Sequence, residues 1–142
     1  ESPRMIRLAG ILARLLPNLP LRSGLDAGKL SHDPQVAVDY VADPLRHGWI
    51  TPRLADFIFR EGAACIADAA ELAVPTLLLV AESDELVDPA GSRAFAKAAA
   101  PGGQLTTRFF ASLYHELFNE TEPGRGQVLM QLGDWLGRQL PR

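Results

Sequence analysis

A strand–helix–strand pattern between residues 76 and 110 constrains the fold more than any other feature of this chain. TLLLVA, residues 76–81, is a continuous apolar run, as expected of a strand that is covered on both faces. Asp88 and Pro89 are residue types that cap and open a helix, and LTTRFF, residues 105–110, supplies the second strand. Together they indicate a βαβ unit, in which the two strands run parallel.

The same pattern indicates that the chain is part of a larger domain. Two parallel strands do not form a stable sheet alone, because such sheets need neighbouring strands and cover on both faces. No clear third strand precedes residue 76, and the chain begins with Glu1 rather than Met. We therefore predict an α/β fold of which this chain is the C-terminal part. A mostly helical region, residues 1–73, should precede a βαβα unit of a parallel sheet, residues 74–142.

The N-terminal region is predicted to begin with an amphipathic helix. Ser2 and Pro3 suit its cap and first position, apolar residues recur at helical spacing, and Pro17 ends the run. Three arginines give the helix a basic edge: Arg4, Arg7 and Arg14. Two interpretations stay open. The helix either packs on its own protein or presents a surface that touches lipid or admits an apolar substrate.

Three residue pairs further along predict helix starts, because each places a capping side chain before a proline. They are Asp33-Pro34, Asp43-Pro44 and Thr51-Pro52. The first two should open short helical turns in an irregular stretch, and the third a longer helix.

The composition excludes several classes of function. With 14 Lys and Arg against 17 Asp and Glu, the net charge is −3, so no basic surface indicates a nucleic-acid partner. The single cysteine and the three unclustered histidines do not have metal-ligand spacing, so we expect no metal and no other cofactor. No apolar run reaches the roughly 18 to 20 residues of a membrane span. We expect a cytoplasmic protein, peripheral to a membrane if the first helix contacts lipid.

The candidate catalytic residues follow the two predicted strands. Both strands point the same way, so their carboxyl ends share the edge of the sheet where open α/β folds place their chemistry. AESDELVD follows the first strand and ASLYHE the second. A carboxylate and the imidazole of His115 should therefore emerge side by side. In such a pair the carboxylate fixes the ring tautomer and leaves the other ring nitrogen as a base.

Asp84, 31 positions before His115, is the strongest candidate for that carboxylate. Asp88 is explained as a helix cap, and Glu82 could belong to the strand end, whereas Asp84 has no evident structural task. The other two histidines are interpreted as solvated surface residues: His32 and His47.

A base needs a nucleophile, and the sequence offers none. None of the six serines lies in a G-x-S-x-G motif or on a sharp turn between a strand and a helix. Ser83 and Ser112 are near the candidate pair but lack this turn, and Cys65 lies within a predicted helix. The α/β-hydrolases carry their catalytic triad in the order Ser, Asp, His. Here the last two members are present in that order and the first is absent.

Several phrases of the sequence resemble the monoacylglycerol lipase and lysophospholipase group of α/β-hydrolases: LLPNLPL, LSHDP, DYVADPLRHGWIT, VPTLLLVAESDELVDPAGS and FFASLYHELFNE. The resemblance covers nearly the whole chain but only the C-terminal half of a family member. It implies that residues 1–73 are the cap, or lid, over the acyl pocket, and that residues 74–142 belong to the α/β-hydrolase core. It also implies that Asp84 is the triad acid and His115 the triad base.

The resemblance implies a serine esterase that hydrolyses the ester bond of a monoacylglycerol or a lysophospholipid. Its partners would be the lipid ester, a membrane touched by the cap, and the missing N-terminal half that carries the serine and the oxyanion-hole amides. The chain alone would be inactive, because acid and base cannot form an acyl-enzyme without the nucleophile. The alternatives are another reaction on this fold (acyl transfer, C–C hydrolysis or dehalogenation) and a non-catalytic lipid-binding module.

Overall fold

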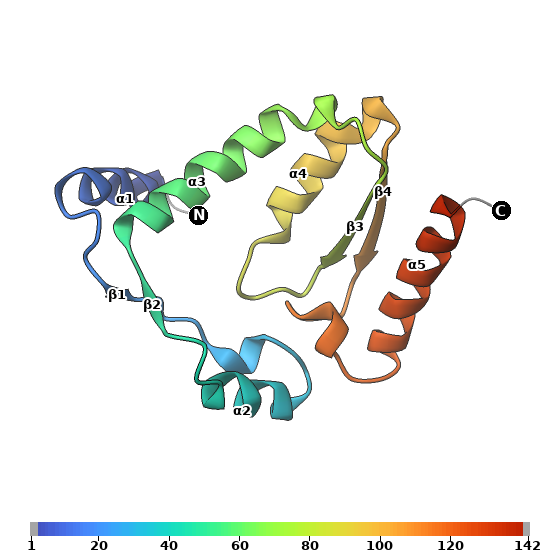
Figure 1. Cartoon of the computed structure of the whole chain (residues 1–142), viewed down its shortest axis with the longest axis horizontal. Helices are drawn as coiled ribbons and strands as arrows, with labels where there is room; N and C mark the ends of the chain where they lie inside the picture. Colours follow the sequence, from blue (N-terminus) through green and yellow to red (C-terminus); the bar gives the residue numbers. More distant parts are fainter. Residues whose placement is uncertain (1–2, 141–142) are drawn as a thin grey trace.

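The computed structural model describes residues 3–140, so Ser2, the expected cap of the first helix, lies outside the described residues. The chain forms two segments that surround an opening (Figure 1). Residues 3–73 form a mostly helical segment, and residues 74–140 form a pair of parallel strands between two helices. The segments also meet across the opening, where the N–H of Glu116 donates to the carbonyl oxygen of Leu30 at 2.8 Å.

The N-terminal segment is built mainly from three helices. They are α1 (Pro3–Leu15), α2 (Pro34–Ala42) and α3 (Pro52–Ala67), joined by the short turns η1 (Ala27–Lys29) and η2 (Ala69–Glu71). α1 lies along α3, and α2 lies at the other end of the segment beside η1 (Figure 1). Two short strands pair antiparallel between them, β1 (Leu21–Arg22) and β2 (Trp49–Ile50). This pairing was not predicted, because strands of two residues are too short to show a period in the sequence.

Two of the three predicted helix starts are confirmed. The side chain of Asp33 accepts a backbone N–H in the first turn of α2, and Thr51 does the same for α3. The third prediction holds only in part, because Asp43 also ends α2 as its C-terminal cap and Pro44 opens a single turn that does not continue into a helix. The Asp43 carboxylate accepts the N–H of Leu45 at 2.8 Å and closes that turn, which leads the chain toward β2.

The C-terminal segment holds the predicted strand–helix–strand unit. β3 (Thr76–Ala81) and β4 (Leu105–Phe110) run parallel, with Thr76 opposite Leu105 and Ala81 opposite Phe110. The two strands therefore end at the same edge.

Helices connect and flank these strands. The crossover from β3 to β4 is α4 (Pro89–Ala99), capped by Asp88 as predicted, and then the turn η3 (Ala100–Gly102). Gly103 follows with a φ of 68°, a left-handed conformation that glycine adopts without strain. After β4 come η4 (Leu117–Asn119) and α5 (Gly124–Gln139). α4 and α5 lie on opposite sides of the strand pair (Figure 1).

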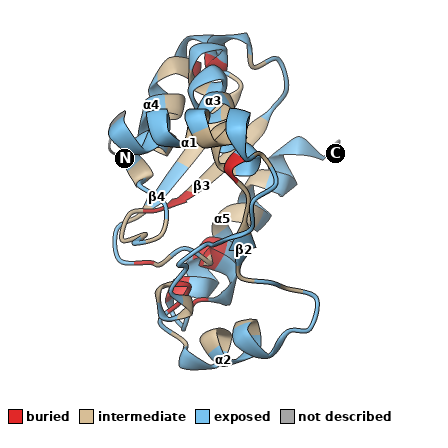
Figure 2. Cartoon of the chain, turned by 90° about the vertical axis from the view of Figure 1, so that its left-hand side faces the viewer, coloured by how far each residue is buried: buried red, intermediate tan, exposed pale blue. Residues whose placement is uncertain are grey.

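Most buried residues of the C-terminal segment lie at the carboxyl end of β3, in the loop after β4 and in the first half of α5 (Figure 2). Val80 and Ala81 are buried but residues 76–79 are half-buried, so the expectation of a strand covered on both faces holds only at this end. Within residues 3–140, β3 pairs with β4 alone, which leaves its other edge open. The buried cluster comprises Ala81, Leu113, Leu117 and Val128, with Leu79 and Phe110 packed against it. Because two of these leucines follow β4, the cluster anchors the loop that carries His115.

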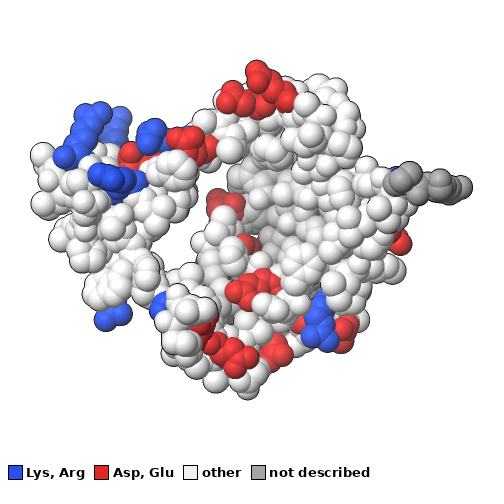
Figure 3. Space-filling model, viewed as in Figure 1, with Lys and Arg blue, Asp and Glu red and all other residues white. Residues whose placement is uncertain are grey.

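α1 packs against α3 but leaves much of its apolar surface exposed. Leu12 is half-buried, whereas five of its other large apolar side chains are 43–71% exposed: Met5, Ile6, Leu8, Ile11 and Leu15. Lys and Arg side chains gather at the same end of the molecule (Figure 3). Of the helices in the described residues, none is long and apolar enough to span a bilayer.

Candidate active site

Hydrogen bonds between the ends of β3 and β4 align the two loops that follow them. The N–H of Glu82 extends the strand pairing by donating to the carbonyl oxygen of Phe110 at 2.9 Å. The hydroxyl of Ser83 then donates to the carbonyl oxygen of Ala111 at 2.8 Å. The two loops therefore leave the sheet side by side.

These loops bring His115 and Asp84 into contact, with Nδ1 of the imidazole 2.7 Å from Oδ2 of the carboxylate. The other oxygen, Oδ1, accepts the N–H groups of Leu86 and Val87 at 2.8 and 3.0 Å. Burial raises the pKa of Asp84, but the hydrogen bonds from His115 and from these two N–H groups outweigh it, and the pKa lies below its ordinary value. An ionised carboxylate only accepts, so the proton of a neutral imidazole is assigned to Nδ1 and Nε2 keeps its electron pair.

The other acidic side chains of the loop after β3 have different partners. Glu82 forms an ion pair with Arg93, and Glu85 forms one with Lys29 at 2.9 Å. Asp88 accepts a backbone N–H as the cap of α4. Asp84 is thus the member of this acidic group that the fold brings to the imidazole.

His115 lines a cavity of about 560 Å³ between the two segments, and the wall of this cavity is mainly but not wholly apolar. Its apolar lining comes from both sides: Met5, Ile50, Ile58 and Phe59 from the N-terminal segment, and Leu86 and Val87 from the C-terminal one. The ion pair between Lys29 and Glu85 lines the same cavity and links the segments. Its size and lining suit a hydrocarbon chain with a polar group near the imidazole.

Within residues 3–140, no serine, threonine or cysteine is hydrogen-bonded to His115. The hydroxyl of Ser83 is engaged with a backbone carbonyl, and Ser112 lines a different cavity. Ser23 lines the same cavity as His115, but its oxygen accepts the N–H of Leu25. In the same part of the chain, no three His, Cys, Asp or Glu side chains gather as metal ligands would. The described site therefore combines an acid and a base without a nucleophile bound to the base.

Sequence reasoning missed the contacts of His32. It was interpreted as a solvated surface residue, and its side chain is 42% exposed. However, its Nδ1 lies 2.9 and 3.0 Å from the two carboxylate oxygens of Glu120, and its ring stacks on that of Tyr114. The interpretation is therefore right about the exposure of His32 but missed these contacts. No local pattern marks a pair that is 88 positions apart. His47 is exposed, as expected.

The sequence matches the family described as "Serine aminopeptidase, S33" over residues 2–122. It is 33% identical over 136 residues to a monoacylglycerol lipase of Mycolicibacterium smegmatis, an alignment that covers 95% of this chain and 47% of that protein. It is also 25% identical over 115 residues to an uncharacterized abhydrolase domain-containing protein of Dictyostelium discoideum, covering 81% of this chain and 12% of that one. The chain thus spans about half the length of the first of these relatives, and less of the second.

Two solved structures resemble the whole described fold. The monoacylglycerol lipase of Paleococcus ferrophilus matches with a TM-score of 0.86 and 32% identity, covering 96% of this chain and 52% of that one. A soluble variant of the monoglyceride lipase of Saccharomyces cerevisiae, in complex with a substrate analog, matches with a TM-score of 0.80 and 19% identity. That match covers 97% of this chain and 50% of the yeast chain, and it concerns the fold alone. The predicted fold class is therefore confirmed.

Proposed function

We propose that this chain is part of a serine esterase that acts on monoacylglycerols or lysophospholipids. The proposal starts from the family, because the chain belongs to the serine aminopeptidase S33 family of α/β-hydrolases. The observation that carries this proposal is the contact between His115 and Asp84 in the wall of a mainly apolar cavity. A base with a fixed tautomer suits acyl transfer, and the cavity suits an acyl chain. The monoacylglycerol lipases among its relatives and structural neighbours favour an ester substrate over an amide.

In this proposal the two segments have different roles. Residues 1–73 are the cap that encloses the acyl chain, and residues 74–142 are the part of the core that carries acid and base. The exposed apolar side chains of α1 and its arginines would rest on a membrane from which the lipid enters. The protein would be cytoplasmic and peripheral to that membrane.

The proposed chemistry uses Nε2 of His115. It would take the proton of a serine hydroxyl as that oxygen attacks the ester carbonyl, and then return the proton to the glycerol oxygen that leaves. Asp84 would hold the ring in this tautomer and stabilise the imidazolium. Water activated by the same nitrogen would then release the fatty acid.

The serine itself is proposed to lie upstream of residue 1. The chain order in α/β-hydrolases is Ser, Asp, His, and this chain spans about half of the lipases that it matches. We therefore expect residues 1–142 alone to turn over no ester, whereas the full-length protein, with the upstream sequence in place, should do so.

The test is to label the full-length protein with a fluorophosphonate probe and to measure the release of glycerol from a monoacylglycerol. A serine should be labelled, and His115→Ala should abolish both labelling and hydrolysis. His47→Ala is the matched control, because that histidine is exposed and does not line the cavity. A folded wild-type protein that is neither labelled nor active would refute the esterase and favour a lipid-binding module. Release of an amino acid from an amino-acid amide, without ester cleavage, would reassign the substrate class.

A further inference from the structure

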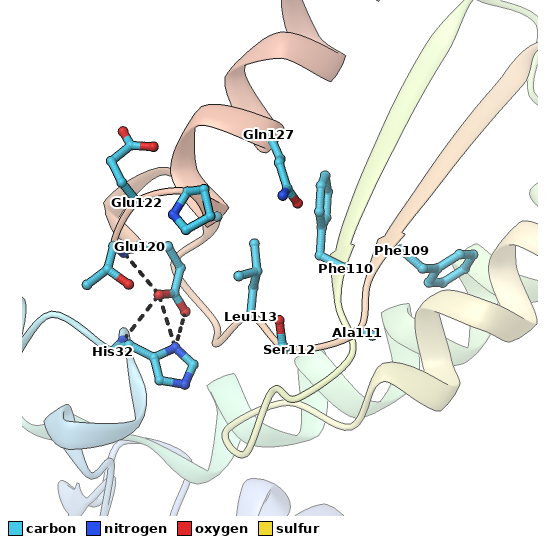
Figure 4. A pocket seen from close by; sticks show the side chains of 12 residues that line it. His32, Phe109, Phe110, Ala111, Ser112, Leu113, Glu120, Glu122 and Gln127 are labelled. Atoms are coloured by element: carbon cyan, nitrogen blue, oxygen red, sulfur yellow. Dashed lines mark hydrogen bonds and ion pairs between the residues drawn. The ribbon is translucent and has the colours of Figure 1, made fainter.

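Glu120 is a buried carboxylate that accepts hydrogen bonds from four donors. Its residue is 2% exposed, and in Figure 4 its carboxylate points at the ring of His32. Besides Nδ1 of that ring, the carboxylate accepts the backbone N–H groups of Tyr114 at 2.6 Å, Thr121 at 3.2 Å and His32 at 3.4 Å. Burial raises the pKa of Glu120, but these hydrogen bonds outweigh it and the pKa lies below its ordinary value.

These bonds surround the residue that carries the proposed base. The N–H of Tyr114 belongs to the residue before His115, so Glu120 closes the loop from residue 114 to residue 121 on itself. The ring of Tyr114 stacks on His32, with the ring centres 3.8 Å apart. The backbone on both sides of His115 is therefore tied to one buried carboxylate.

The stretch 30–33 of the N-terminal segment is bonded to the same loop at two more points. The hydroxyl of Ser31, which is itself buried, donates to the carbonyl oxygen of Asn119 at 2.8 Å. The N–H of Glu116, the residue after His115, donates to the carbonyl oxygen of Leu30 at 2.8 Å. With the bond from His32, three successive residues of this stretch contact the loop.

We propose that the contact between His32 and Glu120 positions His115, so that the N-terminal segment helps to set the geometry of the proposed catalytic pair. This inference rests on the proposed function. His32 and Glu120 are positioning residues, because neither lies against the cavity that His115 faces. They act by fixing the backbone of the loop, and through it the 2.7 Å contact with Asp84.

The physical reason is that the loop has little regular structure of its own. It contains one turn, η4, and otherwise depends on the side chains that anchor it. The side chain of His115 is 38% exposed, so packing alone does not hold the ring in place. A displacement of the base by about 1 Å costs on the order of 10²-fold in rate, which makes such anchoring necessary.

Steady-state kinetics of the full-length protein on a monoacylglycerol test the proposal, with active sites counted by fluorophosphonate labelling. His32→Ala removes a donor, and Glu120→Gln places an amide NH₂ where N–H groups converge. Each should lower kcat per labelled site by roughly 10- to 100-fold and leave KM within about 3-fold. The double variant should be no slower than the slower single one, because both remove the same contact. His47→Ala and Glu122→Gln are the matched controls and should keep wild-type kcat.

A conservative variant separates positioning from a general loss of structure. In His32→Asn the amide nitrogen stands close to the place of Nδ1 and can donate to Glu120, so most of kcat should return. A variant that merely unfolds would lose labelled sites instead, with kcat per site unchanged. Unchanged kcat per site in both His32→Ala and Glu120→Gln, or no recovery in His32→Asn, would overturn the proposal.

A spectroscopic readout keeps this inference distinct from the proposed function. The proton between Nδ1 of His115 and Asp84 should give a downfield NMR signal in the full-length wild-type protein, whether or not it hydrolyses esters. The signal should shift or broaden in His32→Ala and persist in His47→Ala. An inert wild-type protein would refute the esterase, and an unchanged signal in His32→Ala would refute the positioning.

Discussion

Replacing Asp84 with Asn in the full-length protein tests the proposed acid. The amide oxygen can take the place of Oδ1 and accept the N–H groups of Leu86 and Val87, now bonded at 2.8 and 3.0 Å. The amide nitrogen then replaces Oδ2, which lies 2.7 Å from Nδ1 of His115. A nitrogen that donates there requires Nδ1 to accept, so the ring proton moves to Nε2. An Nε2 that carries the proton cannot act as the base.

The expected loss in kcat is roughly 10⁴-fold, the scale of the same substitution in a serine protease triad. The expected loss in unfolding free energy is only about 1 kcal/mol, because one charge-assisted hydrogen bond becomes a neutral one while the bonds to Oδ1 persist. A large kinetic effect and a small stability effect should therefore occur together in Asp84→Asn.

The assay is monoacylglycerol hydrolysis by full-length wild-type protein and by two variants, with thermal unfolding measured on the same samples. Asp88→Asn is the control, because it makes the same substitution four residues on and its amide oxygen can still cap α4. It should retain kcat within about twofold of the wild-type value. The reasoning would be refuted if Asp84→Asn kept more than about a tenth of wild-type kcat, or if the control lost as much.

Two further predictions concern stability. Gly124→Ala should destabilise the full-length protein by about 1–3 kcal/mol, because the new methyl group would lie 2.6 Å from a methyl of buried Leu113. Gly133→Ala, in the same helix with open space around it, should stabilise it by about 0.5–1 kcal/mol, and urea unfolding of both variants checks the contrast. Because the pKa of Glu120 and that of Asp84 are lower in the folded state, their stabilisation is complete above about pH 4.5 and is lost as the pH falls through the folded values. Urea unfolding from pH 6 down to about pH 3 should show this decline, and a Glu120→Gln variant that declines as steeply would contradict it.

Local sequence patterns correctly predicted helix caps, because a cap depends only on residues that are close together in the chain. Asp88 caps α4 and Asp33 caps α2 through N–H groups two positions further on, so the residue types alone were sufficient. At Asp43 the same pattern led to a single turn without a helix, because an aspartate before a proline suits a turn as well as a helix start. There the pairing of β2 with β1, more than 20 residues earlier, takes the chain away from a helical path.

The closeness of Asp84 and His115 depends on one further step, the parallel pairing of two strands. A crossover helix between two apolar runs makes that pairing nearly obligatory, so topology alone brings the loops after both strands to one edge. The loop after β3 carries four carboxylates, and their separate partners became visible only in three dimensions: Glu82 with Arg93, Asp84 with His115, Glu85 with Lys29 and Asp88 with the start of α4.

The strand–helix–strand unit, its helix caps and the edge where an acid and an imidazole meet could therefore be predicted from the sequence, because these follow from short-range spacing and from the handedness of the chain. Three further features emerged only from the packing of the whole chain: Glu120 is buried, His32 is its partner from 88 positions away, and α1 leaves most of its large apolar side chains exposed. Whether a residue is buried depends on all the residues that pack around it. The types and the spacing of Glu120 and His32 do not specify those neighbours.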